Sequence, residues 1–354
     1  MLTLAGCAYA RRSGADAQSF RAEQNREAGV LLAHATASDL AAAALLLALN
    51  DPNVRQPSDL IERAQTLAPQ RPELVWVHLA ICGWLKCEAR AQIAAHLQAL
   101  DPDNGFAWTP DLETLPLSDS DAVTAVIARI GAARRITIYW NQLEVMMVDA
   151  LAVASPSQDL ATRGIDAIGI LAAEVIPPLQ AISRACRPEQ LDLRGRRAAC
   201  EAMVAHLEQS DTLLTQGLAL SLQERWWPAG SPQRDVLHAK RRQLDYLMTV
   251  SGRIRRWRTN HDMAVRIEAA RSTAREEDVA RAVIMSLGLP LEPPVAWRDP
   301  VHPDQKTPMA SRHIPVLDQA GSRKPVRSED TLRPGNDGAT YSPEAATGQP
   351  RQVP

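Results

Sequence analysis

The sequence predicts an all-α protein of stacked antiparallel helix pairs, followed by longer helices and a disordered C-terminal tail. Alanine and leucine dominate the apolar residues, aromatic residues make up only 4% of the chain, and apolar positions before residue 290 recur at helical spacing. Alanine and leucine favour helices, whereas strands favour β-branched and aromatic side chains. With 354 residues, of which 45% are hydrophobic, the chain can bury a sizeable core and is long enough for two domains.

The first half reads as short helices separated by proline-containing turns. The predicted helices cover residues 40–49, 60–67, 74–82 and 88–100. Ser38-Asp39 is the expected N-terminal cap of the first helix, and Gly83 is the expected break after the third.

Longer helices are expected in the second half. Residues 155–158, Ser-Pro-Ser-Gln, have the order of a cap, a first-turn proline and a capping-box glutamine, which predicts a helix from there to about residue 185. Residues 194–223 are expected to form one helix, and Ser231-Pro232 begins another that carries apolar residues as far as Trp257. Residues 273–276 resemble a capping box for a last short helix.

A period of 33 to 34 residues is visible in the first half. Leu67-Ala68-Pro69 recurs 33 positions later as Leu100-Asp101-Pro102, and Trp76 and Leu79 lie early in a predicted helix. This arrangement resembles the tetratricopeptide repeat, in which a Trp and a Leu lie in the first helix and a Pro closes the second. The resemblance covers about residues 38–130 and lacks the family's Gly, Tyr and Ala-Phe positions. It implies an α-solenoid of helical hairpins, a surface that commonly binds peptides or proteins.

Composition divides the chain into four parts. These are residues 1–20, a truncated signal and polar lead-in; 21–153, the tetratricopeptide-like region; 154–290, a second helical region; and 291–354, a proline-rich tail. Eleven of the 25 prolines fall in the tail, and its apolar residues have no period. Such a segment buries too little surface to offset its ordering entropy, so we expect disorder from about residue 305. Residues 291–297 are short enough to pack on the helical body.

Deleting residues 306–354 is expected to leave the melting temperature nearly unchanged, because the deleted segment has no apolar pattern with which to pack. Thermal unfolding of the full and shortened chains, followed by circular dichroism, checks this. A large drop in the shortened chain would show that the tail packs on the helices.

The first residues contain a short match to a bacterial export signal. Leu4-Ala5-Gly6-Cys7 resembles the lipobox, in which small residues admit the signal peptidase and the cysteine becomes lipidated. The basic and long apolar regions of a complete signal are missing. Either the true start lies upstream and Met1 is internal to the signal, or the match is a coincidence in a cytosolic protein. In the first case Cys7 carries lipid, and Ala8 imposes no obvious retention in the inner membrane.

The cysteine count bears on the same question. If Cys7 is lipidated, four cysteines remain, and their spacing predicts the pairs Cys82–Cys87 and Cys186–Cys200. Local disulfides of this kind are typical of an oxidising compartment such as the periplasm. The alternative is that all four are reduced thiols in the core of a cytosolic protein.

No metal site is expected. His78, Cys82, Cys87 and His96 lie within one predicted hairpin, and zinc accepts mixtures of Cys and His ligands. Their spacing matches no standard zinc finger, however, so a disulfide is the better interpretation of the two cysteines.

Nucleic-acid binding is not expected either. Residues 240–242 and 253–258 form a basic region that includes Trp257, a combination that can bind phosphates. On a helix, most of these charges fall opposite the apolar residues, which is typical of a solvated face. The net charge of −2 provides no long-range attraction for nucleic acid or for an anionic membrane.

The sequence contains no recognisable catalytic or cofactor motif. GxSxG, HExxH and a glycine-rich phosphate loop are all absent. The nearest acid–base clusters are His206 with Glu208 and Asp211, and His261 with Asp262, on the polar sides of amphipathic helices. No apolar run reaches the length of a membrane-spanning helix. We therefore expect no catalytic residues and no cofactor.

The leading interpretation is a non-enzymatic helical-repeat protein that binds a protein or peptide partner. With the lipobox, it would be a lipoprotein that faces the periplasm and contacts a membrane only through Cys7. The alternatives are a cytosolic helical adaptor and a helical-repeat enzyme whose site the sequence does not reveal.

Overall fold

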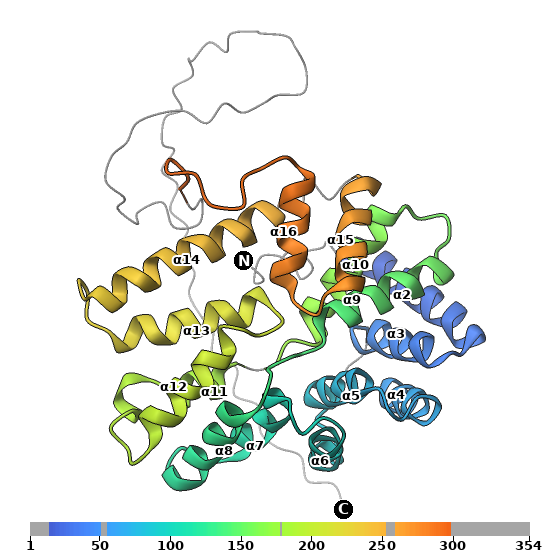
Figure 1. Ribbon diagram of the computed structural model, residues 1–354. Helices are drawn as coiled ribbons and strands as arrows, with labels where there is room; N and C mark the ends of the chain where they lie inside the picture. Colours follow the sequence, from blue (N-terminus) through green and yellow to red (C-terminus); the bar gives the residue numbers. More distant parts are fainter. Residues whose placement is uncertain (1–13, 51–54, 178, 253–258, 299–354) are drawn as a thin grey trace, which may run out of the picture. The chain divides into compact units, whose positions relative to one another are not determined.

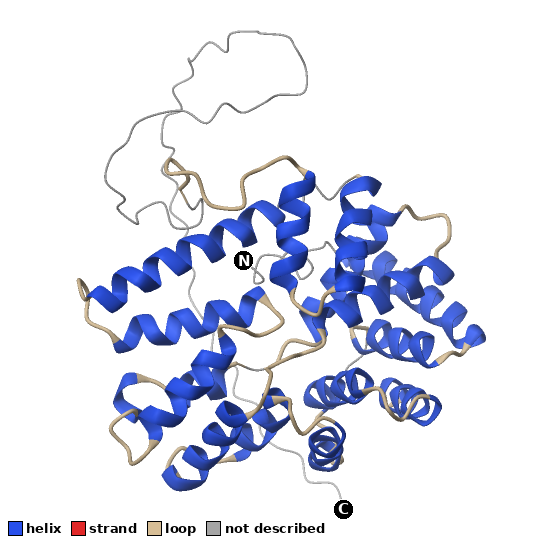
Figure 2. Ribbon diagram, viewed as in Figure 1, coloured by secondary structure: helices blue, strands red, loops and turns tan. Residues whose placement is uncertain are grey.

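The computed structural model describes residues 14–50, 55–177, 179–252 and 259–298 (Figure 1). Across these residues the regular secondary structure is helical, with fifteen α-helices, two short 3-10 helices and no β-strand (Figure 2). The predicted all-α fold is confirmed. The described residues belong to one unit, Met1–Pro308, and a second unit, Met309–Pro354, lies outside them together with Cys7. Disorder of the tail therefore stays a prediction.

Neighbouring helices in the chain pack against one another, mostly as consecutive pairs. In chain order the helices are α2 (Gly14–His34), α3 (Ala37–Ala48), α4 (Gln56–Leu67), α5 (Pro72–Leu85), α6 (Arg90–Leu100), η1 (Gly105–Trp108), α7 (Thr109–Thr114), α8 (Ser120–Ala132), α9 (Trp140–Ala154), α10 (Leu160–Glu174), α11 (Gln180–Ala185), η2 (Pro188–Gln190), α12 (Arg196–Leu207), α13 (Leu213–Trp226), α14 (Pro232–Ser251), α15 (Asn260–Ser272) and α16 (Glu276–Ser286). No helix in this part of the chain is long and apolar enough to span a bilayer.

The period seen in the sequence corresponds to two successive helix pairs. Helices α5 and α6 begin 35 and 34 residues after α3 and α4, respectively. The regularity ends after α6, where η1 and the six-residue α7 stand in place of a full helix. Pro110 lies in the first turn of α7, where its missing N–H is tolerated.

The main core is continuous from Ala28 to Ile267, and α3 is one of its most buried helices. Nine of the twelve residues of α3 are buried, most of them alanine or leucine, and α2, α4, α5, α9 and α10 all contact it. Small alanine side chains let these helices approach closely on several sides, which explains why this segment is apolar all round. A smaller cluster joins α13, α14 and α16.

Residues 291–297 pack on α14, as their apolar content predicted. Trp297 is 7% exposed and meets Tyr246 edge to face, with ring centroids 5.5 Å apart. Arg242 donates to the carbonyl of Pro294, and the Tyr246 hydroxyl donates to the carbonyl of Pro290 at 2.6 Å.

The predicted break at Gly83 is wrong. Helix α5 continues through Gly83 to Leu85, and the chain turns at Lys86, which has a φ of 52°. A glycine inside a helix costs only about 1 kcal/mol. The extra turn also brings Trp84 into contact with Glu174, so a tertiary interaction outweighs the local preference.

The predicted helix start at Ser155 is also wrong. The Ser155 hydroxyl donates to Glu27 Oε1 at 2.7 Å, a residue 128 positions away, and therefore does not cap a helix. Helix α10 instead begins after Asp159, whose carboxylate accepts the N–H of Thr162 at 2.7 Å. Similarly, α3 is capped by Thr36 rather than by Ser38.

Residues 194–223, expected to form one helix, form α12 and α13. The break contains Asp211, whose carboxylate accepts the backbone N–H groups of Ile138 and Trp140 from a distant loop. Thr212 then caps α13. Two other boundaries differ as well, since α2 occupies part of the expected polar lead-in and α14 ends at Ser251.

Candidate functional site

A cavity of about 420 Å³ lies among α5, α6, α7 and the segment that joins α10 to α11. Its volume falls in the range typical of ligand sites. The lining residues are Trp76, Leu79, Ala80, Gly83, Trp84, Arg90, Thr109, Pro110, Glu113, Glu174, Val175, Ile176, Pro177 and Gln180.

Two indoles from α5 form one wall of this cavity and bind the end of α10. Trp76 Nε1 donates to the carbonyl of Val175 at 3.1 Å, and Trp84 Nε1 donates to the carbonyl of Glu174 at 3.3 Å. Both bonds satisfy carbonyl groups that a helix C-terminus leaves without partners. Trp76 is buried, whereas Trp84 is 58% exposed. Because both N–H groups are already used, the indoles offer a ligand their ring surfaces.

Glu174, the last residue of α10, supplies a buried carboxyl group to the cavity. The residue is 6% exposed, and its Oε2 has no hydrogen-bond partner. Burial raises the pKa of the Glu174 carboxyl to about 7. An unsatisfied buried carboxyl is unfavourable for stability, and such groups concentrate at functional sites.

The other charged side chains of the lining pair with each other. Arg90 donates to a carboxylate oxygen of Glu113 from the neighbouring helix. The Nε of Arg90 is buried and has no partner. The hydroxyl of Thr109 donates to the carbonyl of Phe106 at 2.8 Å. The cavity therefore retains one uncompensated acid and one free guanidinium donor.

The disulfide Cys82–Cys87 fixes the turn between α5 and α6. Its Cα atoms are 4.9 Å apart, and it closes a loop of five sequence positions. Trp84 lies inside this loop and Arg90 directly follows it, so the covalent bond restrains the spacing of two lining residues.

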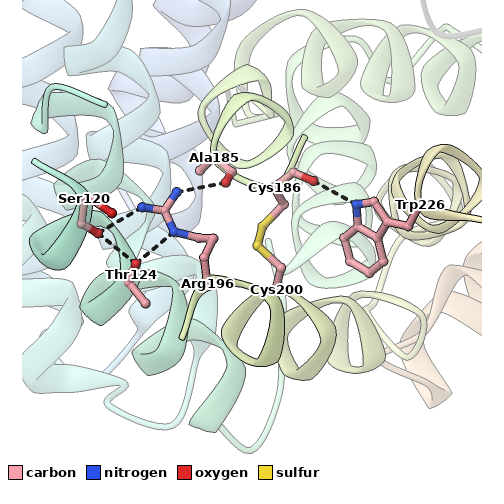
Figure 3. The surroundings of a disulfide bond; sticks show 7 residues. All are labelled: Ser120, Thr124, Ala185, Cys186, Arg196, Cys200 and Trp226. Atoms are coloured by element: carbon pink, nitrogen blue, oxygen red, sulfur yellow. Dashed lines mark hydrogen bonds between the residues drawn. A yellow bond between two sulfur atoms is a disulfide. The ribbon is translucent and has the colours of Figure 1, made fainter. Parts of the chain in front are cut away.

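The disulfide Cys186–Cys200 lies on the other side of α11 from the cavity segment (Figure 3). It joins the end of α11 to α12, with Cα atoms 5.8 Å apart. The carbonyl of Cys186 accepts a bond from Trp226 Nε1 at 2.8 Å. Because Gln180, the first residue of α11, lines the cavity, this disulfide helps to hold the cavity wall in place.

A buried arginine reinforces the same junction. Arg196 is fully buried, and its guanidinium donates to the carbonyls of Ala185 and Ser120 and to the Thr124 hydroxyl, each at 2.9 Å (Figure 3). These bonds connect the start of α12 with both α11 and α8.

The two cysteine pairs are the ones expected from their spacing, which brings Cys82 together with Cys87 and Cys186 together with Cys200. His78 is 3% exposed, and its ring contacts Ser58 Oγ at 3.0 Å and Gln65 Nε2 at 3.3 Å. Burial lowers the pKa of His78 to about 4. Within the described ranges, no group of three or more Cys, His, Asp or Glu is arranged to hold a metal ion.

The other candidates from the sequence take part in internal contacts. Lys240 pairs with Glu208, and Arg241 pairs with Glu224, whereas residues 253–258 lie outside the described ranges. Asp211 is buried in the backbone contacts described above, and burial raises the pKa of its carboxyl to about 6.

Sequence reasoning did not find the cavity. Its indoles and its buried acid lie about 90 positions apart, and no local pattern joins them. The one available signal was Glu174 itself, an acid at the end of an otherwise apolar helical run. Comparison with protein-family models, curated proteins and solved structures finds no match for this chain.

Proposed function

We propose that this chain is a non-enzymatic binding protein that holds part of a protein or peptide ligand in the cavity beside Trp84. The observation that carries the proposal is an exposed indole at a cavity that also contains a buried, unpartnered carboxyl. Exposed tryptophans beside pockets are enriched among residues that dominate binding energies. The consecutive helix pairs support a tetratricopeptide-like mode of peptide binding.

The chemistry of the lining supports binding rather than catalysis. The lining contains no Ser, Cys or His, and its one Thr hydroxyl donates to a backbone carbonyl. Nucleophilic catalysis requires a nucleophile with an adjacent base, and Glu174 has neither a nucleophile nor a second acid–base group beside it in the lining apart from the paired Glu113.

We further propose that the protein works in an oxidising compartment. The two disulfides support the periplasm over the alternative of a cytosolic adaptor, because thiols in the cytosol are kept reduced. Together with the lipobox, this favours a lipoprotein that is anchored to the outer membrane through Cys7 and faces the periplasm.

Replacing Trp84 by alanine is expected to weaken peptide binding by roughly 10- to 30-fold, because truncation of an aromatic anchor costs about 2 kcal/mol. Peptides selected from a displayed random library on the oxidised full-length protein would be titrated by isothermal calorimetry. Leu67→Ala is the matched control, since Leu67 is 60% exposed on α4 and lies outside the cavity.

Circular dichroism of both variants would verify that they fold. Selected peptides that bind Trp84→Ala as tightly as the unmodified protein would exclude this cavity as their site. Failure to select any peptide that binds in solution would argue against the proposed function as a whole.

A further inference from the structure

We propose that the group bound in this cavity is an alkylammonium cation, supplied by a lysine side chain of the ligand and held between the Glu174 carboxylate and the indoles of Trp76 and Trp84. The inference rests on the proposed function and specifies the chemistry of its ligand.

The charge of the lining favours a cation. Arg90 and Glu113 neutralise each other, so Glu174 leaves the lining with one uncompensated negative charge when it is ionised. Its Oε2 is buried without a hydrogen-bond partner. A bound ammonium would donate to this oxygen and compensate the buried charge, whereas a bound anion would add a second one.

The position of Glu174 strengthens this preference. It is the last residue of α10, a helix of fifteen residues, and helix C-termini carry partial negative charge. The carbonyl groups of Glu174 and Val175 already accept the two indole N–H groups, which hold the helix end at the cavity. The carboxylate and the helix end therefore favour the same sign of ligand charge.

The indoles suit the rest of a lysine side chain. Tryptophan is the aromatic residue that attracts cations most strongly through its ring, and the methylene stem of lysine packs well on apolar surface. Leu79 and Ala80 provide further apolar surface beside them. A single unpartnered oxygen also fits the compact ammonium of lysine better than the planar guanidinium of arginine, which favours two-oxygen contacts.

A second unpartnered atom favours an amine carried by a peptide. The buried Nε of Arg90 needs an acceptor, and it belongs to the same lining as Glu174. A peptide that inserts a lysine brings carbonyl oxygens with it, whereas a free alkylamine does not.

The test uses the oxidised full-length protein and isothermal calorimetry at pH 8. n-Butylammonium chloride is expected to saturate the protein with a dissociation constant on the order of 1 mM, and neutral n-butanol is not expected to bind. Glu174→Gln should weaken n-butylammonium binding by about 10- to 100-fold, because it removes one charge-assisted hydrogen bond. Glu268→Gln, a change of the same kind at an exposed position on α15, should leave binding unchanged.

The source of the amine is resolved with peptides. Acetyl-Gly-Gly-Lys-Gly-Gly-amide is expected to bind more tightly than n-butylammonium, and its Nε-acetyl-lysine and norleucine versions more weakly. Equal affinity of the lysine peptide and n-butylammonium would overturn the lysine assignment and point to a free amine. Binding of n-butanol equal to that of n-butylammonium, or no loss in Glu174→Gln, would overturn the cation itself.

These outcomes are separable from failure of the proposed function. If library peptides bind through Trp84 without lysine and without Glu174, peptide binding stands and the amine inference falls. If n-butylammonium binds through Glu174 but no peptide is selected, the amine site stands and the protein ligand falls.

Discussion

A variant in which Cys186 and Cys200 are both replaced by alanine is expected to lose about 3 kcal/mol of its free energy of unfolding. The bridge spans 14 sequence positions, and a cross-link of this length restricts the unfolded chain by about that amount. Both cysteines are fully buried in the main core, so the loss of packing adds to the effect.

Chemical unfolding under non-reducing conditions measures this difference, which corresponds to a drop in melting temperature of about 5 to 10 °C. The matched control is the double alanine variant of Cys82 and Cys87, whose shorter loop predicts a smaller loss of about 2 kcal/mol. Mass spectrometry of the non-reduced protein, expressed through a secretion pathway, identifies the pairs. Four free thiols in a well-folded sample would contradict both bridges and remove the main support for the periplasm.

Replacing Glu174 by glutamine is expected to stabilise the protein above pH 7 by up to about 3 kcal/mol. Burial raises the pKa of Glu174 from 4.5 to about 7, so the folded state holds more protons than the unfolded state between these values. The free energy of unfolding therefore falls as the pH rises through this interval. Glutamine has nearly the same shape and stays neutral, so it avoids this loss at pH 8 and has little effect below pH 4.5.

Urea unfolding of the unmodified and Glu174→Gln proteins at pH 4 and pH 8 gives the result as a difference of differences. The same measurement on Glu268→Gln should show no such pH dependence, because Glu268 is exposed. Contributions from other carboxyls cancel in the comparison. Equal destabilisation at both pH values would mean that the Glu174 carboxylate makes a stabilising contact, and the case for an uncompensated acid would fail.

A variant that gains stability while it loses affinity for amines would be the signature of a binding residue. Substitutions that merely damage the fold lower both quantities. Residues retained at a cost to stability are expected where function needs them, so the two Glu174 measurements together separate a ligand site from a defect of packing.

Local patterns in the sequence were sufficient for the fold class and for several helix ends. Apolar spacing identified the helices, Ser231 caps α14 as expected, and the starts of α5 and α6 follow the predicted period. The cysteine spacing also predicted the observed pairs, because both join helix ends that are close in sequence. These features depend on residues within about one helical hairpin of each other.

The remaining features depend on contacts between distant segments. Ser155 lost its capping role to Glu27, and Asp211 interrupts a predicted helix because it binds the loop before α9. The cavity has the same origin, since Trp84 and Glu174 meet only after α10 packs near α5. Single-sequence patterns contain no information on such pairings, so the candidate site could not be predicted from them.

The two disulfides determine when the cavity loses its conformational freedom. One closes the turn that carries Trp84, and the other anchors the short helix that begins at Gln180. The entropy of ordering these walls is therefore lost once, during oxidative folding, and not again at each binding event. A preorganised site of this kind can bind a group as small as one lysine side chain, because little of the interaction free energy is consumed in assembling the protein around it.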